Sequence, residues 1–81
     1  MFENRAQDEK NNVCGLKIAR LRIALPGKVS QRMFAEMLGQ HGMVVSKNLV
    51  SRIERGEWLV TDWELKVIKE VLQVTYEDLL D

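Results

Sequence analysis

The chain has 81 residues, of which 46% are hydrophobic and 30% charged, and its formal net charge is zero at pH 7. This length and composition indicate one small globular domain. We expect no membrane span and no secretory leader, and the single cysteine, Cys14, excludes an internal disulfide, so a cytoplasmic setting is expected.

Charge is distributed unevenly along the chain. Residues 13–57 hold eight basic and three acidic side chains, whereas residues 58–81 hold two basic and six acidic ones. The middle of the chain is therefore a basic block. For binding an anionic partner, this distribution of charge along the chain matters more than the net charge of zero.

The polar residues 1–12 lack periodicity and predict a flexible N-terminal arm, which leaves 13–81 as the folded domain. Apolar residues at helical spacing predict a first helix from Cys14 that Pro26-Gly27 ends. Its inner stripe consists of Cys14, Ile18, Leu21 and Leu25. Ser30 is expected to cap a second helix, which ends at Gly39. The inner face of that helix consists of Phe34, Ala35 and Leu38.

A longer turn, residues 39–45, precedes a third helix that Ser46 caps at its start and Gly56 at its end. Thr61 with Glu64 predicts a capping box for a fourth helix. Thr75 with Asp78 likewise opens a short fifth helix that ends at Leu79-Leu80. Because no strand-like alternation competes, the sequence predicts a compact all-α domain of five short helices.

The third helix carries the clearest functional pattern. At about 100° per residue, its polar and cationic side chains share one face, opposite Leu49, Val50 and Ile53. That polar face consists of Lys47, Asn48, Ser51, Arg52 and Arg55. A helix fits the DNA major groove, where asparagine can pair with adenine and arginine or lysine with guanine. The solvated face of an ordinary core helix carries similar residues, so the helix by itself leaves both interpretations open.

Several segments together resemble the Cro/repressor (Xre-type) helix-turn-helix family, over a stretch from Cys14 to Leu80. The matching segments are Ser30-Gln31, 34–39 (FAEMLG), Ser46, 51–56 (SRIERG) and 72–80 (LQVTYEDLL). The resemblance implies a lambda-repressor-like fold in which the second and third helices form the helix-turn-helix. The loop containing Pro26-Gly27-Lys28 and the turn at 39–45 are both longer than is usual in the family.

The family resemblance also implies a function: a sequence-specific regulator of transcription that binds double-stranded DNA as a homodimer on a palindromic operator. A recognition helix at about 46–55 would lie in the major groove, with Lys47, Asn48 and Arg52 at base edges. The residues implied to contact the DNA backbone are Gln31, Ser46, Ser51 and Arg55. Arg22 and Glu54 would form a partly buried, structural ion pair.

A second apolar stripe, Leu16, Ala19 and Ile23, lies on the outward face of the first helix. It predicts either a surface for self-association or a protein partner, or a surface that the two lengthened loops cover. A surface for self-association or for a protein partner supports an alternative function. That function is a protein-interaction module such as the antitoxin of a toxin–antitoxin pair, with or without DNA binding. A third hypothesis is a helical domain in which the long turn misplaces the third helix and DNA binding is lost.

The remaining apolar residues are expected to pack. At least one of Trp58 and Trp63 should join the core. The C-terminal apolar residues form either a dimer contact or, as favoured for Leu79, the closure of the core; they are Val71, Val74, Tyr76, Leu79 and Leu80. No base stands beside Cys14, and no Cys/His cluster or glycine-rich phosphate loop is found, so we predict no enzyme, no metal and no cofactor.

Overall fold

Five α-helices and no strand occupy residues 14–80, the part of the chain that the computed structural model describes. They are α2 (Gly15–Ala24), α3 (Gln31–Gln40), α4 (Lys47–Glu54), α5 (Asp62–Leu72) and α6 (Tyr76–Leu80). The predicted all-α architecture is therefore confirmed for these residues. The predicted arm, residues 1–12, lies outside the described part, as do residues 13 and 81.

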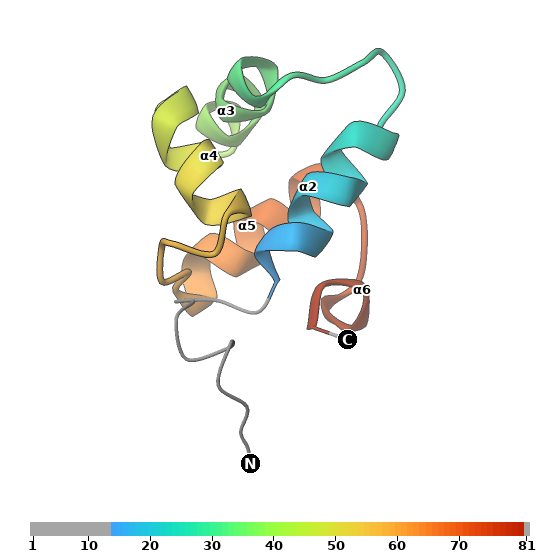
Figure 1. The fold of residues 1–81 in the computed structure, drawn as a ribbon, viewed down its shortest axis with the longest axis vertical. Helices are drawn as coiled ribbons and strands as arrows, with labels where there is room; N and C mark the ends of the chain where they lie inside the picture. Colours follow the sequence, from blue (N-terminus) through green and yellow to red (C-terminus); the bar gives the residue numbers. More distant parts are fainter. Residues whose placement is uncertain (1–13, 81) are drawn as a thin grey trace.

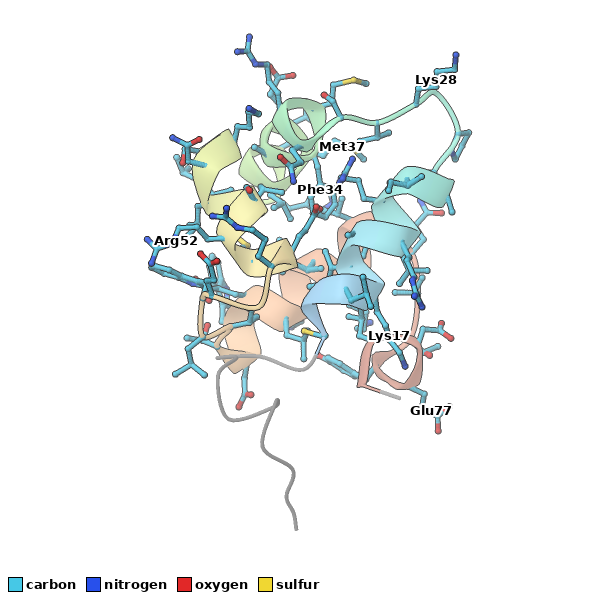
Figure 2. All side chains as sticks on the ribbon, in the orientation of Figure 1. Lys17, Lys28, Phe34, Met37, Arg52 and Glu77 are labelled. Carbon is cyan, nitrogen blue, oxygen red and sulfur yellow. The ribbon has the colours of Figure 1, made fainter. Side chains whose placement is uncertain are left out.

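The helices surround one apolar core. Helix α4 packs against α2 and α3, while α5 packs against α3 and α6 against α2; Figure 1 shows α5 crossing beneath α3 and α4. Every helix supplies at least one of the largest fully buried side chains, which are Ile18, Phe34, Leu38, Val50, Ile53, Ile68 and Leu79. Phe34 points from α3 into this core (Figure 2). The burial of Leu79 confirms that the C-terminal segment closes the core.

The predicted helix starts are confirmed by hydrogen bonds. Ser30 and Ser46 each accept a bond of 3.1 Å from the backbone N–H three residues further on. These bonds satisfy amides that have no partner within the helix. Helix α2 ends at Ala24, because Leu25 takes up the extended backbone that a following Pro26 requires.

The predicted capping box forms at the start of α5, and Thr75 with Asp78 opens α6 as predicted. The Thr61 hydroxyl accepts from the amide of Glu64 at 3.2 Å, and the Glu64 carboxylate accepts from the amide of Thr61 at 2.9 Å. Thr75 and Asp78 make the same pair of bonds, at 3.2 and 3.0 Å. The Thr75 amide, and next its hydroxyl, hold the pKa of the Asp78 carboxyl below its usual range.

The end of α3 differs from the prediction, because Gly39 lies inside the helix and Gln40 is its last residue. The left-handed residue that stops the helix from continuing is Gly42, two positions later, with a φ of 92°. The amide of Gly42 bonds to the carbonyl of Gly39 at 3.0 Å, and the amide of Met43 bonds to that of Leu38 at 2.9 Å. A glycine ends a helix only where it adopts this conformation, so the turn spans residues 41–46 instead of 39–45.

Two side chains of this long turn, Met43 and Val45, pack on the core. Met43 is 2% exposed, and Val45 packs against the core, while Val44 between them is 89% exposed. The buried methionine holds the middle of the turn against the domain, so the turn has a defined path between α3 and α4.

Helix α5 ends on a strained residue. Gln73 has a φ of 60°, and its amide and that of Val74 bond to the carbonyls of Glu70 and Lys69, each at 3.2 Å. This is the hydrogen-bond pattern that normally places glycine at the left-handed position. A side chain there costs free energy because its Cβ crowds the following carbonyl oxygen.

We expect Gln73→Gly to raise the free energy of unfolding by about 1 kcal/mol, since glycine adopts this conformation without the Cβ clash. Urea denaturation measures the change. As a control, Glu36→Gly, at an exposed position in the middle of α3, should instead lower the stability by about 1 kcal/mol. Equal losses in both variants would contradict the assignment of strain to Gln73.

Candidate nucleic-acid interface

Helix α4 has one buried and one exposed face, as its sequence predicts. Val50 and Ile53 are 1% and 2% exposed, and Leu49 packs partly buried against the core. The opposite face presents Lys47, Asn48 and Arg52 exposed and Ser51 half-buried, followed by exposed Arg55 at the C-cap. The structure therefore places the predicted base-contacting residues together on one accessible surface.

Glu54, which is the one acidic residue of α4, faces inward. Its side chain is 5% exposed and pairs with Arg22 of α2, itself 12% exposed. The Nε of Arg22 donates to Oε2 at 2.7 Å and its Nη2 donates to Oε1 at 3.1 Å. The predicted structural ion pair is confirmed, and it removes the negative charge of Glu54 from the exposed face of α4.

Gln31 joins the same carboxylate. Its side-chain nitrogen Nε2 donates to Oε1 of Glu54 at 3.0 Å, so the first residue of α3 lies beside the last residue of α4. Arg22 also donates from Nη1 to the carbonyl of Val29 at 2.8 Å. We call Arg22, Gln31 and Glu54 the Glu54 cluster. Its bonds join α2, the loop before α3, α3 and α4.

The contact of Gln31 with Glu54 is one that the sequence did not reveal, because the two residues are 23 positions apart on different helices. Contact of Gln31 with a DNA phosphate stays a prediction. The bond to Glu54 holds this side chain at the start of α3, where helix N-termini attract anions.

Arg52 lies over an aromatic ring. The guanidinium carbon of Arg52 is 5.6 Å from the centre of the Trp58 indole ring, and Figure 2 shows Arg52 at the outer edge of α4. Trp58 is half-buried and packs against the core, whereas Trp63 is 54% exposed. This confirms the expectation that at least one tryptophan joins the core, but no sequence signal indicated the contact with Arg52.

Arg55 forms a surface ion pair with Glu57, 3.2 Å apart, and the two side chains are 58% and 52% exposed. Exposed pairs of this kind contribute about 0–1 kcal/mol. Arg55 could therefore exchange Glu57 for a phosphate at little cost, and its predicted backbone contact stays a prediction.

The outward stripe of α2 is only partly covered. Leu16 and Ile23 are 61% and 66% exposed, and Ala19 is half-buried. The alternative in which the lengthened loops cover these residues is therefore wrong for Leu16 and Ile23. The loop before α3 instead turns inward at Val29, and the turn before α4 turns inward at Met43, each toward the core.

The one thiol in the chain is buried in the core. Burial raises the pKa of the Cys14 thiol, which is 3% exposed and so remains protonated at neutral pH. No group of three or more His, Cys, Asp or Glu side chains in residues 14–80 could hold a metal ion. None of the described helices is both long and apolar enough to cross a membrane.

Comparison of the chain with family models, curated proteins and solved structures returns no match. Its function is therefore inferred from the geometry and charge of the described residues.

We expect Glu54→Ala to lower the free energy of unfolding by about 3 kcal/mol, because the substitution leaves Arg22 buried without its counter-charge. Urea denaturation measures this loss. The matched control is Glu57→Ala, which removes an exposed carboxylate three residues away and should cost about 1 kcal/mol or less. Equal effects of the two substitutions would contradict the structural role of the Glu54 cluster.

Proposed function

We propose that the chain is a sequence-specific regulator of transcription that binds double-stranded DNA, resembling the Cro/repressor helix-turn-helix family, with α4 as its recognition helix. The observation that carries the proposal is the exposed face of α4. It presents Lys47, Asn48 and Arg52, while Glu54 is turned inward and neutralised by Arg22. A cationic, acid-free helix face with an asparagine suits the major groove, whose base edges accept such donors.

The start of α3 supports the same proposal. Ser30 caps the helix, and the Gln31 side chain is held at the C-terminal end of α4 by its bond to Glu54. A phosphate at the α3 N-terminus would meet the positive end of the helix dipole. Contacts there would fix the position of the protein on the duplex, and the side chains of α4 would read its sequence.

One such module offers few base contacts, so we propose that two copies bind a palindromic operator. Half-sites one helical turn apart, roughly 34 Å, allow two modest contacts to combine. Occupancy of such a site near a promoter would then block or recruit polymerase.

The test is selection of bound duplexes from a random-sequence pool, followed by fluorescence anisotropy across a salt series. We expect enrichment of a palindrome and a steep loss of affinity with salt, roughly a thousandfold between 50 and 200 mM for about six phosphate contacts. Weak binding with no enriched sequence would overturn the proposal.

We expect Arg52→Ala to weaken binding to the enriched duplex by about 1–3 kcal/mol and to relax the preference at the base pair that Arg52 reads. Titrations against the enriched duplex and its single-base variants measure both effects. The control is Lys66→Ala, which removes an exposed charge from α5 and should leave the base preference unchanged. An equal loss on every duplex would make Arg52 a phosphate contact.

A second candidate function is a protein-interaction module, such as an antitoxin, and the exposure of Leu16 and Ile23 favours it. Leu16 and Ile23 lie on one face of α2, and contact with a partner protein would bury these two large apolar side chains away from water. The two functions use different helices, so one chain could perform both.

On this second interpretation, Leu16→Glu with Ile23→Glu abolishes association, because each carboxylate would have to be desolvated at the interface. Light scattering on the purified chain, alone and after co-expression with a captured partner, measures the assembly. Val44→Glu, at an apolar position 89% exposed in the turn before α4, is the control and should leave assembly intact. Loss of assembly in the control as well would argue against a specific role for α2.

A further inference from the structure

The contact between Arg52 and Trp58 joins an exposed cation to a ring that the core holds in place. Arg52 lies in the last turn of α4, with its guanidinium carbon 5.6 Å from the centre of the indole ring. Guanidinium groups are attracted to the face of an indole ring at this distance. Because Trp58 packs against the core, the ring is a fixed support for a side chain that is otherwise long and flexible.

The turn after α4 brings Trp58 to this position. Gly56, with a φ of 79°, reverses the chain, and its amide bonds to the carbonyl of Ile53 at 3.0 Å. The amide of Glu57 bonds to the carbonyl of Arg52 itself at 2.8 Å. These two bonds fix the backbone between Arg52 and Trp58, so the ring position depends on the end of α4 and on the core.

A guanidinium that rests on a ring keeps its N–H donors available, because they point outward in the plane of the group. Guanine presents two acceptors, O6 and N7, that a guanidinium can engage together. An arginine already held in one orientation loses less freedom when it makes those bonds, and binding is tighter as a result.

We infer that Trp58 is a positioning residue that holds the guanidinium of Arg52 ready for a guanine in the major groove. The inference rests on the proposed function and deepens it, since it names the base that Arg52 reads and the residue that orients it. Trp58 itself makes no contact with DNA in this arrangement. Its effect on binding passes through Arg52.

The test is a double-mutant cycle on the duplex that the wild-type chain enriches and on the same duplex with the guanine replaced. Trp58→Leu keeps an apolar side chain but removes the ring face, and it should weaken binding to the enriched duplex about two- to fivefold. Trp58→Phe keeps a ring face and should retain most of the affinity. Trp63→Leu, at the exposed tryptophan, is the matched control and should have no effect.

The cycle separates positioning from a general structural role. In an Arg52→Ala background, Trp58→Leu should cause no further loss, because the side chain that the ring holds is absent. An equal loss with and without Arg52, or an equal loss on both duplexes, would overturn the inference. Thermal unfolding of each variant verifies that it folds. If Trp58→Leu does not fold, binding by Trp58→Phe is compared with binding by the wild-type chain instead.

A second readout needs no DNA. In the free wild-type protein, NMR should show the Arg52 side-chain protons shifted upfield by the indole ring, and Trp58→Leu should remove that shift. Absence of the shift in the wild-type chain would overturn the inference even if the chain binds a specific operator. If the wild-type chain enriches no duplex, the proposed function fails and the assignment of Arg52 to guanine fails with it, whatever the NMR result.

Discussion

The buried carboxylate of Glu54 is the constraint on which the arrangement of the first three described helices depends. A carboxylate removed from water needs an opposite charge and further hydrogen bonds, and here α2 supplies Arg22 while α3 supplies Gln31. Arg22 extends the cluster to the carbonyl of Val29 in the intervening loop. The same bonds that hold the helices together also turn the acidic side chain of α4 inward. The Glu54 cluster therefore fixes the helix packing and also leaves the exposed face of α4 without a negative charge.

The long turn between α3 and α4 does not have to set the orientation of α4. Val50 and Ile53 are buried in the core and Glu54 is bound by two other helices, so packing already fixes the helix. Met43 anchors the middle of the turn, which limits the conformational freedom of the turn. A longer loop costs little more free energy of closure than a short one, and a helix held in this way tolerates a long turn.

The accessible surface is divided between two kinds of chemistry. The cationic face belongs to α4, and the apolar stripe with Leu16 and Ile23 belongs to α2. A DNA duplex and a protein partner would therefore meet different helices. Within the cationic face, Arg52 differs from Lys47 in its support, because a ring packed against the core lies beneath it. A side chain that selects one base benefits from such support. A side chain that contacts any phosphate needs it less, because phosphate contacts carry no sequence information.

The sequence by itself determined the helices, their inner faces and their capped starts, as at Ser46 and Thr61, because these features arise from hydrogen bonds and spacings within about four residues. The pairing of Arg22 with Glu54 was predicted only through the family resemblance, since no local rule joins residues 32 positions apart. Tertiary structure alone decided that Gln31 bonds to Glu54, that Trp58 lies beneath Arg52, that α3 continues past Gly39, and that Leu16 and Ile23 stay exposed. These outcomes depend on how the helices pack around the shared core, which brings together side chains and backbone that are distant in the sequence.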